Sequence, residues 1–341
     1  MKAAVIETPG QVAVRDVAAP RPAPDEVIVS VALAGLCGTD MHIYAGELNY
    51  VYPIVPGHEV VGTIATVGKD VADLAPGMRV AFDPNIPCGQ CHFCRRLRFN
   101  HCLNWQAIGV TRDGGFAEQV AVPAKVVYPI DDLPFEQAVF IEPLSCVVYG
   151  LQRAAPAIGD RVLIFGAGPI GLLLMQVIRR AGAAQVVVTD PQEERLKLAA
   201  ALGADATVPA GDAGEQASLL HEGATFGYDM VVDATGVPNV ATQCFDYVTP
   251  GGKILLFGVC PEDATIPFSP FDLYRRDITV YGSFALNVTF GPAIELLRGG
   301  AVDVEPLISH RFPLEQFPQA LEMARTRSEP TMKVVFEPSS G

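Results

Sequence analysis

Residues 162–171 read Val-Leu-Ile-Phe-Gly-Ala-Gly-Pro-Ile-Gly, a short apolar run that passes directly into glycines with the spacing G-x-G-x-x-G. The run predicts a buried strand, and Pro169–Arg180 predicts a helix behind it. Gly166 permits a tight turn, Gly168 lets a pyrophosphate approach the backbone, and Gly171 lets helix and strand pack closely. Free N–H groups at the helix start favour phosphate binding. The stretch therefore predicts a dinucleotide-binding strand–turn–helix unit.

An acidic residue at the tip of the next expected strand strengthens this prediction. Asp190 stands 19 positions after Gly171, where a carboxylate binds the 2′-hydroxyl of a ribose. A carboxylate repels a 2′-phosphate, so we predict NAD rather than NADP. Two alternatives stay open: Asp190 can cap the helix that begins near Gln192, and Arg195 either reaches a 2′-phosphate or lies on a solvated helix face.

From about residue 155, apolar runs of five or six residues alternate with helical stretches. The expected strands are Arg161–Phe165, Gln185–Thr189, Tyr228–Asp233, Lys253–Phe257 and Ile278–Tyr281. The expected helices are Pro169–Arg180, Glu193–Leu202 and Val240–Val248. Because the strands are almost continuously apolar, the alternation indicates a doubly wound α/β domain, whose parallel sheet is covered on both faces.

The two ends of the chain have a different pattern. Before residue 130, β-branched runs such as Glu26–Val31 and Val60–Val67 are separated by Gly, Pro and Asp, which is typical of a barrel or sandwich. After Gly282, helices are expected near Pro292–Arg298 and Leu314–Thr326, followed by a strand at Met332–Phe336. A length of 341 residues favours two domains.

Composition excludes several classes of function. The formal net charge of −14 disfavours nucleic acid and anionic membrane surfaces as partners. Met1–Val17 has no basic segment followed by an apolar run, so no signal peptide is expected. The longest apolar stretch, Val162–Ile178, is short for a membrane span and is interrupted by glycines. We expect a cytoplasmic globular protein.

Four of the eight cysteines lie within 15 residues, as Cys88-x2-Cys91-x2-Cys94-x7-Cys102. Four thiolates in one loop are the ligand set of a closed, tetrahedral structural zinc site. Free or disulfide-bonded cysteines are the alternative. Because four sulfurs fill the shell, His92 and His101 are interpreted as surface residues.

Further candidate ligands are dispersed: Cys37, His58, Glu59 and Glu142. A catalytic zinc uses a mixed Cys, His and carboxylate set and keeps one position open. Taken singly, each has an ordinary structural explanation, because a lone cysteine in a β-rich domain is commonly buried filler.

Five motifs that follow one another along the chain favour a common functional role for these residues. Gly35–His42 (Gly-Leu-Cys-Gly-Thr-Asp-Met-His), Gly57–Gly62 (Gly-His-Glu-Val-Val-Gly), the four-cysteine loop, Ile141–Leu144 and Gly166–Gly171 together resemble the zinc-containing medium-chain dehydrogenase/reductase family, with the sorbitol and butanediol dehydrogenases as the most similar subgroup. The resemblance covers essentially the whole chain. It implies a GroES-like catalytic domain (1–147 and 285–341), an inserted Rossmann domain (148–284), an active site in the cleft, and a homo-tetramer or dimer.

The resemblance also implies roles for residues. Cys37, His58 and Glu142 surround a catalytic zinc with Glu59 beside them, and whether Glu59 or Glu142 is the direct ligand stays open. Asp40 orients the histidine. Thr39 passes a proton through the cofactor ribose to His42, although a turn-capping role for Thr39 is equally open. The expected cofactor-binding residues are Gly166, Gly168, Pro169, Ile170, Gly171, Asp190, Arg195, Thr235, Gly258, Val259, Ser283 and Phe284.

A substrate pocket is expected at Ile43, Phe116 and Ala285. Sorbitol dehydrogenases carry a tyrosine in place of Ile43 and an arginine in the motif that here reads Gly282-Ser283-Phe284-Ala285. These replacements suggest a smaller or less hydroxylated alcohol than sorbitol. Threonine dehydrogenases resemble the chain around Cys37–Tyr44, but less well around Glu142.

The implied reaction is NAD-linked oxidation of a secondary alcohol, most simply a polyol, with one catalytic and one structural zinc per chain. Oxidation of a small diol or of threonine is the alternative within the family. A nucleotide-binding sensor or structural protein would keep the glycines and lose the dispersed ligands. The four-cysteine loop argues against a zinc-free quinone reductase.

Overall fold

The computed structural model describes residues 1–47, 51–130, 132–211, 213–326 and 330–338. The chain forms two compact units. Unit 1 is Met1–Ser145, Phe290–Gly299 and Val304–Gly341, and unit 2 is Cys146–Thr289 and Gly300–Asp303. The sequence placed the boundaries after residues 147 and 284. Gly300–Asp303 also belong to unit 2, because Asp303 is held by the side chain of Gln176. The amide nitrogen of Gln176 donates to the Asp303 carbonyl (3.0 Å), and its amide oxygen accepts from the Asp303 N–H (2.7 Å).

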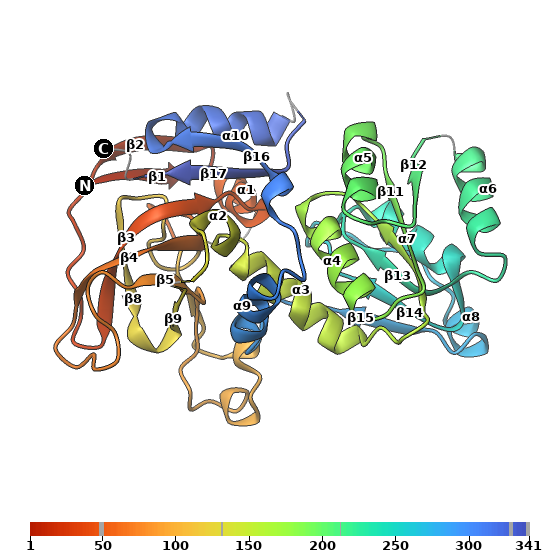
Figure 1. Ribbon diagram of the computed structural model, residues 1–341, viewed down its shortest axis with the longest axis horizontal. Helices are drawn as coiled ribbons and strands as arrows, with labels where there is room; N and C mark the ends of the chain where they lie inside the picture. The colour runs from red at the N-terminus through yellow and green to blue at the C-terminus, as the bar shows by residue number, and fades with distance from the viewer. Residues whose placement is uncertain (48–50, 131, 212, 327–329, 339–341) are drawn as a thin grey trace. The chain divides into compact units, whose positions relative to one another are not determined.

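Unit 2 is built on a six-stranded parallel sheet (Figure 1). Its strands are β10 (Arg161–Phe165), β11 (Gln185–Asp190), β12 (Ala206–Pro209), β13 (Tyr228–Asp233), β14 (Val248–Leu256) and β15 (Thr279–Gly282), in the order β12-β11-β10-β13-β14-β15. The order reverses between β10 and β13, and ligands bind at the carboxyl ends of strands at such a switch point. The predicted doubly wound domain is confirmed.

Helices cover both faces of this sheet. They are α4 (Pro169–Arg180), α5 (Glu193–Ala201), α6 (Ala213–Gly223), α7 (Pro238–Tyr247) and α8 (Pro270–Arg275), and α3 (Ile141–Ala154) precedes them across the first boundary between the units. Leu163 and Phe165 pack with Leu220 of α6 and Tyr247 of α7. Because side chains alternate along a strand, the fully buried Val162 and Ile164 point to the opposite face.

Three elements that lie wholly in unit 2 were not predicted. β12 has only four residues, of which Val208 alone is buried, so it lacks the apolar run that identified the other strands. The other two are α6, which precedes β13, and α8, which precedes β15; α3, which crosses the boundary between the units, was not predicted either. The other expected strands and helices are present, with ends that differ by a few residues.

Unit 1 contains a seven-stranded sheet in the order β16-β17-β3-β4-β5-β9, with β8 paired to β3. Its strands are β3 (Glu26–Gly35), β4 (Glu59–Val67), β5 (Arg79–Phe82), β8 (Gln119–Pro123), β9 (Val127–Pro129), β16 (Ile308–Pro313) and β17 (Lys333–Glu337). Two small sheets are β1 (Lys2–Thr8) with β2 (Gln11–Asp16), and β6 (Asn85–Ile86) with β7 (Gln106–Ala107). The unit also has α1 (Gly38–Ala45), α2 (Phe135–Ala138), α9 (Phe290–Arg298) and α10 (Phe317–Thr326), and short 3-10 helices at Cys94–Arg96, Phe99–His101, Ala124–Val126, Glu305–Leu307 and Leu314–Gln316.

The core of unit 1 joins both ends of the chain. Phe116, Phe317 and Phe336 are fully buried, with ring centroids 4.7–5.2 Å apart. Aromatic pairs at such separations add to the stabilisation from burial. The C-terminal residues are therefore part of the same folded unit as the N-terminal strands.

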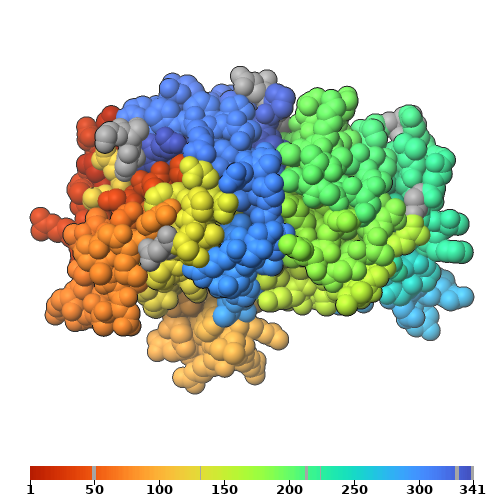
Figure 2. Space-filling model, in the orientation of Figure 1, coloured from red at the N-terminus to blue at the C-terminus, as the bar shows by residue number. Residues whose placement is uncertain are grey.

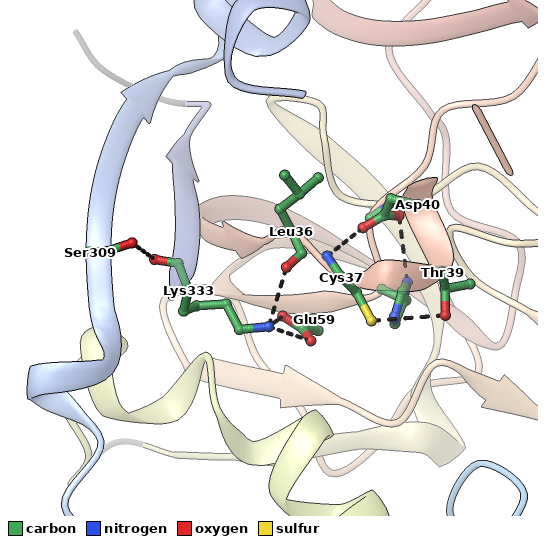
Figure 3. Close-up of polar contacts among 9 residues, drawn as sticks. Leu36, Cys37, Thr39, Asp40, Glu59, Ser309 and Lys333 are labelled. Carbon is green, nitrogen blue, oxygen red and sulfur yellow. Dashed lines mark hydrogen bonds and ion pairs between the residues drawn. The ribbon is translucent and has the colours of Figure 1, made fainter. Parts of the chain in front are cut away.

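The candidate ligand residues of unit 1 lie where three neighbouring strands, β3, β4 and β17, pair with one another. Gly35, the last residue of β3, pairs with Glu59 of β4 on one side and with Val335 of β17 on the other. Helix α1 begins three residues later, at Gly38. This junction brings Cys37, His58, Glu59 and Lys333 together (Figure 3). Among the described residues, no helix combines the length and the hydropathy needed to cross a membrane.

Candidate active site

Cys37, His58 and Glu59 form a mixed cluster, because one ligand atom of each lies within 4.8 Å of the others. His58 and Glu59 are buried, while Cys37 is half-buried at the start of α1. A thiol, an imidazole and a carboxylate are the donor set of a catalytic zinc. The residues present therefore fit a zinc ion.

Asp40 lies behind this cluster and is fully buried. Its carboxylate accepts hydrogen bonds from the N–H groups of Cys37 (2.8 Å) and Gly57 (3.3 Å), and it lies 3.7 Å from Nδ1 of His58. Burial raises the pKa of Asp40 to about 6, although the neighbouring His58 opposes the shift. Asp40 thus fixes the backbone on both sides of the cluster, in the position of a residue that orients a ligand.

The charges of the cluster act on His58. Burial disfavours the imidazolium, but the thiol of Cys37 and the carboxylates of Asp40 and Glu142 outweigh burial and raise the pKa of His58 well above its ordinary value. A metal ligand must be neutral imidazole. Metal binding at this site therefore displaces a proton from His58.

Glu142 lies in the first turn of α3 and is buried. Burial raises the pKa of Glu142 to about 7, while His58 lowers it and Glu59 raises it. Its carboxylate is thus within electrostatic reach of the cluster, but it is not one of the three groups with ligand atoms within 4.8 Å.

Lys333 was not predicted as a site residue. Its Nζ contacts both oxygens of Glu59, at 2.7 and 2.5 Å, and lies 3.3 Å from the Leu36 carbonyl (Figure 3). Both side chains are buried, with 6% and 1% exposure. A sequence signal existed: a lysine within the apolar run Met332–Phe336 requires a buried counter-ion.

Of the two expected proton-relay residues, Thr39 lies beside the cluster. Cys37 Sγ is 3.8 Å from the Thr39 hydroxyl oxygen. His42, in the last turn of α1, is half-exposed and its Nδ1 contacts Glu47.

Two predictions about the substrate pocket are wrong. Ile43 is fully buried in a cluster with Ile6 and Ile54, and Phe116 is fully buried in the core of unit 1. Fully enclosed side chains cannot contact a substrate. The departure from sorbitol dehydrogenases at Ile43 therefore changes core packing rather than a pocket wall.

The four-cysteine loop forms the second metal cluster. Cys88, Cys91, Cys94 and Cys102 bring their sulfurs within 4.8 Å of one another, and none of the eight cysteines is in a disulfide. The N–H of Cys88 donates to Cys102 Sγ (3.2 Å), and the N–H groups of Cys94 and Leu103 lower the pKa of Cys91 to about 6. The donor set fits a structural zinc and not disulfides.

This loop stands out from the rest of unit 1, in light orange at the lower edge of the view (Figure 2). Two of its large apolar side chains, Leu97 and Leu103, are exposed. The predicted surface positions of His92 and His101 are confirmed. A loop with little apolar burial of its own depends on its metal for a fixed structure.

The glycine motif of unit 2 has the predicted geometry. Gly166 has φ +102°, and a Cβ at Gly171 would lie 1.8 Å from the Gly166 carbonyl oxygen. A Cβ at Gly168 would meet only Arg195 Nη1, at 3.8 Å, so the space over this glycine is open. Gly168 caps α4 without a side chain, and Pro169 and Ile170 form the first turn. The open space and the uncapped helix start fit a pyrophosphate.

Asp190 is buried at the end of β11 and organises this motif. Its carboxylate accepts the N–H of Ala167 and the N–H of Gln192, each at 2.8 Å. The N-cap of α5 is Gln192, so the alternative in which Asp190 caps that helix is wrong. Arg195 Nη1 lies 3.9 Å from Asp190, so its guanidinium faces the motif instead of solvent alone.

The other expected cofactor residues follow β13, β14 and β15. Thr235 donates through its N–H and hydroxyl to Asp233. Gly258 packs against Gly236 so closely that a Cβ would lie 2.0 Å from the Gly236 nitrogen. Val259 and Phe284 are exposed, and among the described residues the buried Ser283 hydroxyl has no partner. Ala285 is half-buried with φ 53°.

Known proteins match both parts of the chain. Residues 23–132 match the alcohol dehydrogenase GroES-like domain, and residues 169–299 match the zinc-binding dehydrogenase domain. The fold and the two metal clusters define a zinc-dependent alcohol oxidoreductase that uses a nicotinamide dinucleotide.

Individual relatives agree with this class. The chain is 36% identical to D-arabinitol dehydrogenase 1 of Uromyces fabae (92% of this chain, 90% of that one) and 38% identical to D-altritol 5-dehydrogenase of Agrobacterium fabrum (92% of each). It is 34% identical to L-threonine 3-dehydrogenase of Thermococcus kodakarensis (96% and 94%). The chain belongs to the zinc-containing medium-chain dehydrogenase/reductase family.

Two solved structures cover nearly the whole chain. A zinc-binding dehydrogenase from Sinorhizobium meliloti 1021 bound to NADP matches with a TM-score of 0.92, 36% identity and 99% coverage of both chains. An alcohol dehydrogenase from E. coli CFT073 complexed with NADH matches with a TM-score of 0.91, 32% identity and 99% coverage of both chains.

Proposed function

We propose that this enzyme oxidises one secondary hydroxyl of a polyol to a ketone and transfers the hydride to NAD. The observation that carries the proposal is the buried cluster of Cys37, His58 and Glu59, supported from behind by Asp40. The D-arabinitol and D-altritol dehydrogenases among its relatives support a sugar alcohol as the substrate class.

In this proposal, Cys37 and His58 hold the catalytic zinc, and a glutamate, Glu59 or Glu142, completes the protein ligands. When bound, zinc supplies Lewis acidity, which lowers the pKa of a hydroxyl as it lowers that of water from 15.7 to about 7, and NAD supplies the hydride acceptor. Asp40 keeps the Cys37 and Gly57 backbone fixed during the reaction. Cys88, Cys91, Cys94 and Cys102 hold the structural zinc.

The proton of the substrate hydroxyl leaves through Thr39. Its hydroxyl lies beside the Cys37 sulfur, so it can accept a proton from a group next to the metal. The half-exposed His42, paired with Glu47, then passes the proton to solvent.

NAD is the proposed coenzyme because Asp190 places a buried carboxylate at the end of β11. A carboxylate there favours ribose hydroxyls and disfavours a 2′-phosphate. Arg195 beside it and the NADP-bound relative favour some use of NADP.

Threonine is the second candidate substrate, and the identity with L-threonine 3-dehydrogenase favours it. A polyol carries no charge, whereas threonine carries an ammonium and a carboxylate. Activity with D-arabinitol and none with L-threonine therefore separates the two candidates.

We also propose a homo-tetramer, or a dimer, in the cytoplasm. β15 is an edge strand of its sheet, and Val280 on it and Phe271 and Tyr274 of α8 just before it are exposed. Strand edges and exposed apolar side chains are covered by association. Eight cysteines without a disulfide among them suit a reducing compartment.

The test measures zinc per chain and NAD⁺ reduction with D-arabinitol, D-altritol, 2,3-butanediol and L-threonine. Two zinc ions with turnover of a polyol are expected, and His58→Ala should lose one zinc and all turnover. Fewer than two zinc ions in the wild-type protein, or no turnover of any alcohol, would overturn the proposal.

A further inference from the structure

The Lys333 ammonium is buried in a strand whose next three residues, Val334, Val335 and Phe336, are also buried. An ammonium has three hydrogens to donate, and Nζ has three oxygens near it: Oε1 and Oε2 of Glu59 and the Leu36 carbonyl. A charged group that is removed from water must have its hydrogen-bonding capacity satisfied in this way. Lys333 is therefore committed to Glu59 (Figure 3).

The backbone leaves room for this pair. A Cβ on Gly35 would lie 2.2 Å from Oε2 of Glu59, a separation that real atoms do not tolerate. Gly35 stands between Glu59 and the strand of Lys333 in the sheet. β4 therefore contributes the carboxylate of Glu59, β17 contributes the ammonium of Lys333, and Gly35 of β3 leaves the space that the pair needs.

The charges near the metal cluster decide what this arrangement does. Zinc brings two positive charges, which a Cys37 thiolate and one carboxylate neutralise. Glu59 and Glu142 are both buried, and Lys333 neutralises one of them, Glu59. Glu59 nevertheless keeps an oxygen within 4.8 Å of the Cys37 and His58 ligand atoms, so the metal and Lys333 lie within reach of the same carboxylate.

We propose that Lys333 is a positioning residue that competes with the metal for Glu59 and so keeps one coordination position open for the alcohol. This inference rests on the proposed function of the Cys37–His58 cluster. Without Lys333, Glu59 loses its counter-ion and turns to the metal, which is the other positive charge within reach. The metal is then held more tightly, and the open position is filled by protein.

The test compares Lys333→Met with Lys333→Arg in the full chain, loaded with Co²⁺ in place of the catalytic zinc. Lys333→Met should change the visible cobalt spectrum and should release the metal to a chelator more slowly, by about 10-fold or more. Lys333→Arg keeps a positive charge and should keep a wild-type-like cobalt spectrum. Thermal unfolding shows whether each variant is folded.

A double variant keeps the proposal falsifiable if Lys333→Met folds poorly. Glu59→Gln removes the carboxylate for which lysine and metal compete, so adding Lys333→Met to it should cause no further change in spectrum or metal release. An unchanged spectrum in folded Lys333→Met, weaker metal binding there, or an equal effect in the Glu59→Gln background would overturn the inference. Wild-type chain that binds no metal at the Cys37 site would instead overturn the proposed function.

Discussion

The two metal clusters of this chain differ in almost every physical property. The four-cysteine loop draws identical ligands from 15 consecutive residues, in a segment that projects from unit 1. The Cys37 cluster draws three kinds of ligand from the ends of β3 and β4, and two of the three, His58 and Glu59, are buried. The sulfurs of the loop are surrounded by backbone N–H donors. The Cys37 cluster is surrounded by ionisable side chains, those of Asp40, Glu142 and Lys333.

In the loop the metal fixes the structure of the protein, whereas at the Cys37 cluster the protein fixes the position of the metal. A loop with little core of its own needs an ion to hold it, so its metal contributes to folding. The Cys37 cluster is assembled by a sheet and a helix that have their own apolar core. Its metal is therefore not needed for the fold and is available for chemistry.

The largest expected effects come from exchanging one ligand in each cluster. Cys91→Ser should remove the loop zinc and destabilise the protein, because zinc contributes about 10–16 kcal/mol to the folding of small zinc-binding peptides. Cys37→Ser should remove the other zinc and abolish turnover while changing the unfolding temperature little. Metal analysis, calorimetry and NAD⁺ reduction on the same preparations distinguish the two losses.

Cys260→Ser is the matched control, since Cys260 lies in neither cluster. It should keep both zinc ions and normal turnover. If Cys37→Ser unfolds the protein and Cys91→Ser leaves it stable, the division of roles between the clusters is wrong.

A second effect is the dependence of zinc binding on pH. The pKa of His58 is raised well above its ordinary value and that of Glu142 to about 7, so at neutral pH in the metal-free protein His58 holds a proton and Glu142 is partly protonated. Zinc displaces these protons and that of the Cys37 thiol, so its affinity for the Cys37 cluster should rise with pH by about tenfold per pH unit for each proton still bound.

Zinc binding by the loop should also depend on pH. Burial and the neighbouring thiols raise the pKa of Cys94 to about 12. Zinc affinity of the loop should therefore still rise at pH 9, because Cys94 there still has a proton to lose. Chelator competition from pH 6 to 9, with Cys37→Ser to isolate the loop, measures this curve, and a loop affinity that is level by pH 9 would contradict the assignment.

Asp40→Asn should have a smaller effect, restricted to one cluster. The amide keeps the shape but loses the charge beside His58, so zinc affinity at the Cys37 cluster should fall by about 10–100-fold while the loop keeps its zinc. Asp113→Asn is the control, because Asp113 also accepts a backbone N–H, that of Val55, but lies in neither metal cluster. Equal metal loss in both variants would show that Asp40 acts only through the fold.

The parts of the fold that the sequence predicted are those with a local signal. β10 and α4 were predicted with correct ends, because the apolar run and the glycines specify them directly. β12 was missed since a short edge strand buries too little to leave an apolar pattern. The contiguous cysteine spacing likewise predicted a cluster that the structure assembles.

The buried site was harder to predict because its determinants are far apart in sequence. Lys333 meets Glu59 across 274 residues, and no local pattern links them. The pocket prediction for Ile43 and Phe116 failed for the same reason, since burial in a core depends on distant strands and helices. Glu142 was recognised by its motif, but its distance from the other ligands depends on where α3 begins.

The smallest expected effect concerns the histidines of the loop, which by residue type alone are candidate ligands. His92 is exposed and contacts Arg96, while four sulfurs already complete a tetrahedral shell. His92→Ala should therefore keep two zinc ions and change stability by less than about 0.5 kcal/mol, as is usual for surface positions. Metal analysis after dialysis against a chelator, beside Cys91→Ser, measures the difference. Loss of the loop zinc in His92→Ala would mean that the loop binds its metal through a mixed shell and resembles the Cys37 cluster.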